Sequence, residues 1–182
     1  MARYLKSLLL YLVAVVVSTA AAPILPLFAV MCYGHSNNRT RLLFEPRLPT
    51  WLAWFDNPDN SLWGDDGWQR EHCPRFFGCY RGMVRWLWRN KAGGFVWNVL
   101  GAKVAGSITW EGTPGIDSSP YKAGKLTCRS GDYWQWKWVS PPIGRRCLVL
   151  NFGWLLDAFI DNPFYAPAAR FLFQIQFSEI KE

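Results

Sequence analysis

The sequence predicts an α+β protein, with a hydrophobic N-terminal helix that anchors the chain in a membrane, a small antiparallel sheet and one amphipathic helix. Three observations predict this class. Residues 8–34 carry no charge, residues 81–89 place basic and apolar side chains at a helical period, and several segments of the second half alternate apolar and polar residues. We therefore divide the chain into an anchor over 1–35, a basic connector over 36–50 and a Trp-rich α+β body over 51–182.

The composition favours a membrane as the place where excess apolar surface is buried. Of 182 residues, 51% are hydrophobic and 18% are charged, against roughly 25% charged in ordinary soluble domains. The net charge of +7 favours an anionic partner such as lipid headgroups. Twelve tryptophans add to this, because Trp is enriched where a membrane meets water.

The uncharged N-terminal run is long enough to cross a bilayer. Its 27 residues would extend roughly 40 Å as a helix, more than the ~30 Å hydrocarbon core. The alternative is a cleaved signal peptide, in which Arg3 and Lys6 precede the apolar run and small residues at 18–20 mark the cleavage site. The run continues for fourteen residues past Ala20, which favours an anchor.

Two features leave the geometry of this segment open. Pro23 and Pro26 remove backbone donors, so a straight single helix is not expected through them, and a kinked span or a helical hairpin are the alternatives. The basic residues after the segment outnumber those before it, which places the body in the cytoplasm by the positive-inside rule. We therefore expect the protein at the inner membrane of its cell.

Three arginines recur every fourth residue and predict an amphipathic helix. They are Arg81, Arg85 and Arg89. This spacing places three guanidinium groups on one stripe, as in a helix lying on anionic lipid. A soluble helix with solvated arginines is the alternative. Binding of nucleic acid is disfavoured, because no RNA-binding aromatic fingerprint or zinc-finger spacing accompanies the pattern.

The second half of the chain predicts four or five antiparallel strands. In YWQWKWV, residues 133–139, three tryptophans face one way while Gln135 and Lys137 face the other, so we expect the Trp side to be packed. A turn at 129–132 pairs this strand with the preceding one. The other expected strands lie at 106–110, 125–128, 147–152 and 171–177. We expect their Trp and Phe face to pack on the arginine-striped helix.

The stretch FDNPDNSLWGDDGW, residues 55–68, gathers acidic residues in an otherwise basic chain. With the helix start that follows, its candidate site residues are Asp56, Asn57, Asp59, Asp65, Asp66, Glu71 and His72. Such carboxylates and His72 could bind a metal ion. However, an EF-hand loop begun at Asp59 would place Trp63 where an oxygen ligand belongs.

The favoured interpretation of this stretch is a rigid turn. Pro58 fixes φ, Gly64 and Gly67 permit positive φ, and Asp65 or Asp66 can cap the following helix. The Asp-Asn-Pro sequence recurs at 161–163, as expected for a turn that is used twice. Whether the stretch binds a metal stays open at this stage.

Other chemistry finds little support. The chain has no Gly-rich phosphate loop, GxSxG elbow or HExxH motif, and only two histidines, so we predict no cofactor and favour a non-enzymatic protein. The five cysteines form no CxxC pair. We interpret them as small buried residues; Cys73 and Cys79 would be the best disulfide pair in an exported body, and Cys32 could carry a lipid.

Four motifs together resemble a family of small proteins of tailed bacteriophages. They are PILPLFA in the anchor, W-x-x-W-F-D-N-P-D-N-S-L-x-G-D-x-G-W, V-R-W-L-W-R-N-K-A-G-G-F-x-W-x-V-L-G at 84–101, and N-F-G-W-x-L at 151–156. The resemblance implies a phage-encoded protein associated with the host inner membrane, and it implies no catalytic residues. The expected function is that of an accessory protein that interacts with anionic lipid or with a host or phage membrane protein. The alternative is a metal-dependent envelope hydrolase with Asp56, Asp59, Asp65 and His72 as ligands.

Overall fold

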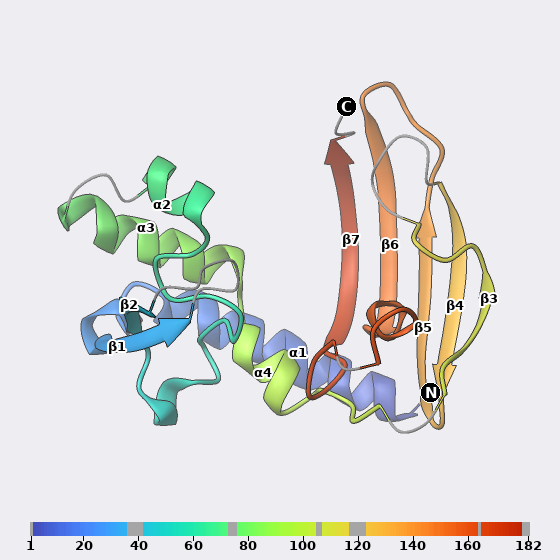
Figure 1. Ribbon diagram of the computed structural model, residues 1–182, viewed down its shortest axis with the longest axis horizontal. Helices are drawn as coiled ribbons and strands as arrows, with labels where there is room; N and C mark the ends of the chain where they lie inside the picture. Colours follow the sequence, from blue (N-terminus) through green and yellow to red (C-terminus); the bar gives the residue numbers. More distant parts are fainter. Residues whose placement is uncertain are drawn as a thin grey trace. The chain divides into compact units, whose positions relative to one another are not determined.

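The computed structural model describes residues 2–35, 42–72, 76–104, 107–116, 123–163 and 165–179, and the statements below concern these residues (Figure 1). The chain forms two compact units. We call Ala2–Val99 the helical unit and Leu100–Glu182 the sheet unit, and each is described by itself. Together they confirm the α+β class: an apolar N-terminal helix, a five-stranded antiparallel sheet, a small two-stranded sheet and a few helices.

The helical unit begins with the long helix α1 and continues through short elements. These are α1 (Ala2–Ala21), the 3-10 helix η1 (Leu25–Phe28), β1 (Val30–His35), β2 (Leu42–Arg47), the 3-10 helix η2 (Thr50–Leu52), α2 (Asp66–His72), α3 (Phe76–Arg89) and α4 (Gly93–Asn98). Strands β1 and β2 pair antiparallel in a sheet of their own.

The helix α1 ends just before the two prolines, and the apolar segment then changes structure. Pro23 and Pro26 lack the N–H groups that a continued α-helix would use, and the chain instead forms η1 and then β1. The predicted interruption is therefore present. Over the described residues it produces neither a kinked continuous helix nor a helical hairpin.

The core of the helical unit is built from leucines that come from distant parts of the sequence. Its buried residues are Ala22, Leu25, Leu48, Leu52, Leu62 and Leu87. Burying a leucine side chain contributes roughly 1.5–3 kcal/mol. Because Ala22 and Leu25 follow α1 directly, this core fixes the C-terminal end of α1 to the folded unit.

The sheet unit is an antiparallel meander in the order β3-β4-β5-β6-β7 (Figure 1). Its elements are β3 (Thr109–Gly112), β4 (Gly124–Ser130), β5 (Tyr133–Val139), β6 (Arg146–Trp154), the 3-10 helix η3 (Asp157–Phe159) and β7 (Phe171–Glu179). The turn between β4 and β5 uses Gly131 at φ +56°, a conformation that glycine adopts without strain.

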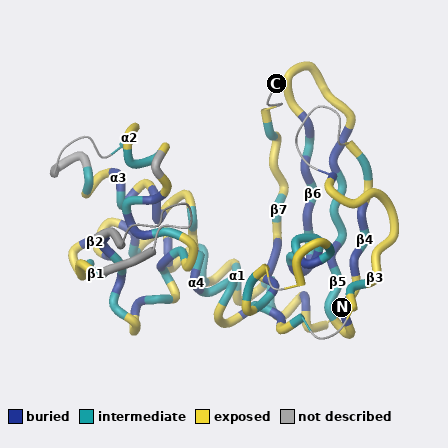
Figure 2. Tube along the Cα trace, viewed as in Figure 1, coloured by how far each residue is buried: buried dark blue, intermediate teal, exposed yellow. Residues whose placement is uncertain are grey.

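Within the sheet unit the more buried side of β5 is the Gln135 side, whereas we expected the Trp side to be the packed one. Gln135 is fully buried, whereas Trp134, Trp136 and Trp138 are only half-buried. In Figure 2, β5 is drawn in the colours of buried and intermediate residues. The reason is that the Gln135 amide is satisfied. Its Oε1 accepts the N–H groups of Leu156 and Asp157, each at 2.7 Å, and its Nε2 donates to Asn151 Oδ1 at 3.1 Å.

The opposite side, called the Trp face below, carries the three tryptophans of β5 and aromatic residues of β6 and β7. The rings of Trp136 and Phe152 stack at 5.9 Å, and those of Phe152 and Phe173 lie 5.6 Å apart. The predicted packing of this face on the arginine-striped helix stays a prediction, since α3 belongs to the other unit.

Candidate functional site

The helix α1 has the length and hydropathy of a membrane span. Its 20 residues would extend about 30 Å, which matches the ~30 Å hydrocarbon core. A signal sequence or the core helix of a soluble protein can share this composition. A core helix would be mostly buried, whereas only 17% of the apolar window of α1 is buried.

The exposed side of α1 is an apolar stripe along the helix. Leu5, Leu9, Leu12 and Val16 are between 47% and 68% exposed. They recur at the spacing that keeps side chains on one helical face. This stripe is apolar surface for which water is a poor solvent.

The C-terminal end of α1 is held by aromatic side chains of α3. The Nε1 of Trp88 donates a hydrogen bond to the Thr19 carbonyl at 3.0 Å, and the Tyr80 hydroxyl donates to the Pro23 carbonyl. Thr19 lies in the last turn of α1, where backbone carbonyls lack partners within the helix, and Pro23 lies two residues beyond its end. The two bonds therefore attach α3 across the end of α1.

Exposed aromatic residues gather around this end of the helix. Trp51 is 69% exposed and packs edge-on against Phe28 of η1, with ring centroids 5.8 Å apart. Trp54, which is 57% exposed, packs against Phe95 of α4 at 5.9 Å. We call the exposed members of this set the aromatic cluster; they are Phe28, Trp51, Trp54, Tyr80 and Trp88.

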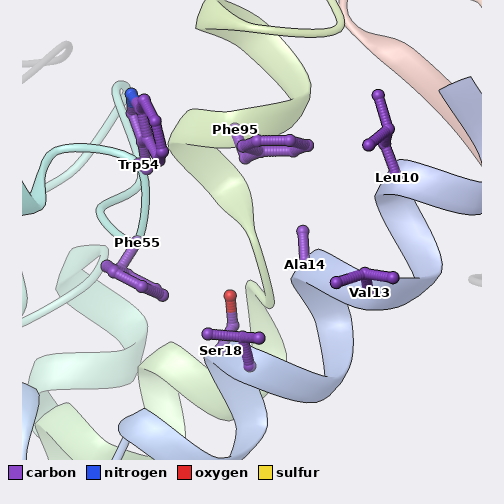
Figure 3. A pocket seen from close by; sticks show the side chains of 8 residues that line it. Leu10, Val13, Ala14, Ser18, Trp54, Phe55 and Phe95 are labelled. Atoms are coloured by element: carbon purple, nitrogen blue, oxygen red, sulfur yellow. The ribbon is translucent and has the colours of Figure 1, made fainter.

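An apolar groove runs beside the second half of α1. It encloses a volume of about 260 Å³. Figure 3 shows Phe95 between Trp54 on one side and Leu10 of α1 on the other. The groove is lined by Leu10, Val13, Ala14, Val17, Ser18, Trp54, Phe55 and Phe95. Ser18 is the one polar side chain in this lining, so the groove suits a hydrocarbon chain better than a polar ligand.

Two glycines bring the walls of this groove together. A Cβ on Gly94 would lie 1.9 Å from the Ala53 carbonyl oxygen, and one on Gly93 would lie 3.0 Å from the Asp56 carbonyl oxygen. The Phe95 N–H then donates to the Trp54 carbonyl at 2.9 Å. The GGF and WFDNP segments, which the sequence places in separate motifs, are thus in direct backbone contact.

The arginine stripe divides in the structure. Arg81 and Arg85 are exposed, and neither forms an ion pair with another described residue. They stand seven and three residues before Trp88, so all three side chains lie on one side of the helix. Arg89 instead lies over the rings of Trp68 and Trp86, 5.3 and 5.4 Å from the centroids, a cation–π arrangement.

The start of the acidic stretch forms a buried turn. Asp56 is 7% exposed, and its carboxylate accepts the N–H groups of Leu48 at 3.3 Å and Asn57 at 2.9 Å. The Asn57 side chain in turn accepts the Asp59 N–H at 3.4 Å. Burial raises the pKa of Asp56 to about 6, against the lowering effect of these N–H groups and of the charge on Arg47.

The end of the stretch starts α2. Asp65 Oδ1 accepts the Trp68 N–H at 2.8 Å, which is the bond of an N-cap residue. His72 stacks on Trp68 at 3.8 Å, and its Nδ1 lies 3.8 Å from the exposed Glu71 carboxylate, too far for a hydrogen bond. The side chain of Asp66 and the whole of Cys73 lie outside the described part.

The structure does not bring the predicted metal ligands together. Among the described residues, no three His, Cys, Asp or Glu side chains lie close enough to hold a metal ion. Asp56 is occupied by two backbone N–H groups and Asp65 by the start of α2. The geometry of the stretch is that of two successive turns, and the metal hypothesis stays untested.

The structure describes four of the five cysteines. Cys128 and Cys147 are buried, and Cys32 and Cys79 are half-buried. Burial raises the pKa of the Cys128 thiol to about 12, so it is protonated at neutral pH. The suggested Cys73–Cys79 pair involves a residue outside the described ones.

We predict that Asp56→Asn flattens the pH dependence of the helical unit's stability. The folded state binds the Asp56 proton more tightly than the unfolded state does. Protonated Asp56 therefore stabilises the folded state fully below about pH 4, and this stabilisation is lost as the pH rises to about 6. A difference of about two pKa units corresponds to about 3 kcal/mol. Urea unfolding at pH 4 and pH 7 measures it.

The matched control is Asp59→Asn, because Asp59 is exposed. It should keep the pH dependence of the unaltered chain. An Asp56→Asn variant with that same dependence would show that Asp56 titrates normally.

Sequence reasoning missed several members of this site. Phe28, Trp51 and Tyr80 were not predicted as site residues. Trp51 and Trp54 are three residues apart in the sequence, and both are exposed in the structure. The Trp content was the available signal. It did not tell which tryptophans lie near α1, because that depends on contacts between residues distant in sequence.

The fold and site define an α+β protein whose N-terminal helix is long and apolar enough to cross a membrane. A family model matches residues 1–181, and the chain belongs to that family, DUF7338, a family of unknown function. Neither a curated protein nor a solved structure matches the chain.

Proposed function

We propose that the protein is a non-enzymatic, membrane-anchored accessory protein. In this proposal α1 enters the bilayer, and the helical unit sits in and on the leaflet at the C-terminal end of α1. The observation that carries the proposal is the exposed apolar stripe of a helix whose end is fixed to a folded unit. In a bilayer, lipid chains would cover this stripe, so its apolar side chains would not be exposed to water.

The aromatic cluster supports a position at the membrane surface. Trp and Tyr are enriched where the hydrocarbon core meets the headgroups, and Trp88 and Tyr80 contact α1 at its end. Trp54 and Phe95 line the groove with Leu10 and Val13, which lie about two turns of α1 before Thr19. The apolar groove would then lie among lipid chains and be filled by one of them.

Two arginines supply the attraction to lipid headgroups. Arg81 and Arg85 are exposed next to Trp88 on α3. A basic residue near an anionic membrane contributes about 1 kcal/mol, and this attraction weakens with salt. Anionic lipid is therefore the partner we propose for this part of the stripe, while Arg89 is held over two rings of its own unit.

The biological setting follows from the resemblance to proteins of tailed phages. It makes the inner membrane of a bacterial host the proposed location, with the folded part in the cytoplasm. A host or phage membrane protein is a further proposed partner. Interference with host envelope functions, exclusion of a second phage and assistance in lysis all agree with such a protein.

A double substitution in α1 tests the proposal. Leu9 and Val16, 64% and 68% exposed, lie outside the groove lining, so Leu9→Asp with Val16→Asp should leave the helical unit folded. Each Asp near the centre of a spanning helix costs about 2.5–3.5 kcal/mol. We expect the variant to leave the membrane fraction.

Ile143→Asp is the control, because Ile143 is 65% exposed in the sheet unit and distant in sequence from α1. This variant should stay with the membrane. The intact mass of the membrane-bound chain must include α1, since cleavage after Ala20 would remove it and contradict the anchor.

A further inference from the structure

We propose that two copies of this chain associate through strand β7. The two β7 strands would pair antiparallel about a two-fold axis at Ile175 and join two five-stranded sheets into one. This inference rests on the sheet unit and does not depend on how α1 meets a membrane.

Within the described part of the sheet unit, strand β7 pairs with another strand on one side only. It is last in the strand order, pairs with β6 on one side, and runs for 9 residues, whereas the other edge strand, β3, has 4. Edge strands are commonly protected by Pro, Lys or a bulge. The sequence FLFQIQFSE contains no Pro or Lys, and its register with β6 is unbroken from Phe171 to Glu179.

The middle of β7 is self-complementary. Residues 173–177, Phe-Gln-Ile-Gln-Phe, read the same in both directions. Antiparallel pairing centred on Ile175 therefore places Ile175 opposite its own copy, and Phe173 opposite the Phe177 of the second copy. A two-fold interface requires such a match, because the same patch must serve on both sides.

The side chains of this segment expose large apolar surface. Ile175 and Phe177 are each 62% exposed and Phe173 is 37% exposed. All three lie on the Trp face, since they alternate along β7 and Phe173 contacts Phe152. Along β7, exposed and intermediate residues follow two buried ones at its start (Figure 2). Aromatic and branched apolar side chains that face each other across two paired strands stabilise the pairing more than alanines do.

The other face of β7 is complementary as well. Gln174 Nε2 donates to Gln176 Oε1 at 2.9 Å along the strand. In the proposed register, Gln174 stands opposite the Gln176 of the second copy. Gln174 keeps one amide hydrogen and Gln176 keeps both, and each side-chain carbonyl oxygen keeps at least one lone pair for this cross-strand partner.

Cross-linking of the full chain in detergent micelles tests the register. Ile175→Cys should give a covalent dimer with a short bifunctional thiol reagent, identified by a linked peptide pair containing residue 175. Phe173→Cys is the control: two copies of residue 173 would be about 14 Å apart, four residues along antiparallel strands. Equal linking at both positions, or none at 175, would overturn the proposal.

The mass of the particle tests the association itself. The unaltered chain and Ile143→Lys should show twice the mass of one chain by light scattering after subtraction of detergent, and Ile175→Lys should show half of that. Ile143 is 65% exposed and serves as the matched position. The proposed association would be refuted if the unaltered chain were monomeric, also where its β7 binds lipid instead. A dimer that Ile175→Lys does not affect would refute it as well.

Discussion

Gly94→Ala is expected to destabilise the helical unit by about 3 kcal/mol. The added Cβ would lie 1.9 Å from the Ala53 carbonyl oxygen and 3.0 Å from that of Asp56. Both are backbone atoms, so no side-chain rotation relieves the overlap. The Ala53–Asp56 backbone must move away from α4, which breaks the bond from Phe95 N–H to the Trp54 carbonyl.

Hydrogen exchange of the full chain in micelles measures this effect locally. Faster exchange is expected around residues 50–56 and 93–99, with the strands of the sheet unit unchanged. Gly67→Ala is the control, because its Cβ would meet only the Asp65 side chain at 3.4 Å, and alanine favours a helix by about 1 kcal/mol. Equal exchange in both variants would contradict the close contact.

Gln135→Leu is expected to destabilise the sheet unit by about 3 kcal/mol. Leucine fills a similar volume but offers no hydrogen bonds. The N–H groups of Leu156 and Asp157 lose their acceptor, and Asn151 Oδ1 loses a donor. Each buried polar group that loses its hydrogen-bond partner costs roughly 1–3 kcal/mol. Glutamine is favoured at this position because it pairs all three of these groups.

Denaturant unfolding, followed through the exchange of amides in β4–β6, measures this loss. Lys125→Leu replaces an exposed residue of β4 in the same sheet and should change stability by less than about 1 kcal/mol. A Gln135→Leu variant as stable as Lys125→Leu would mean that the three hydrogen bonds contribute little.

The strands were predictable because their signal is local. Alternation at 133–139 and 171–177 identified β5 and β7, and the mostly apolar run at 147–152 was expected to be the strand that is β6. The buried face was not predictable, since alternation gives two faces without saying which one is covered. The burial of Gln135 depends on the backbone of Leu156 and Asp157, about twenty residues away.

The candidate site shows the same division between local and distant effects. The Asp65 cap follows from a local helix rule and was expected from sequence. The position of Arg89 over Trp68 and Trp86 requires α2 to be placed against α3. The burial of Asp56 likewise requires Leu48 to approach it. Neither placement has a local sequence signal.

The end of α1 was predictable only in part, because its position has a local sequence signal and its contacts do not. Pro23 indicates where the helix stops, and the structure ends α1 at Ala21. The residues that follow contribute Ala22 and Leu25 to the core. The hydropathy of the segment does not distinguish residues buried in protein from those facing lipid, because both are apolar.

The central claim is that α1 holds the protein in a bilayer, and alkaline carbonate extraction of membranes tests it most directly. The measured quantity is the fraction of full-length chain that stays in the membrane pellet. The account predicts that the unaltered chain and Ile143→Asp remain in the pellet, while Leu9→Asp with Val16→Asp is released. Release of the unaltered chain, or equal retention of the double variant, would contradict it.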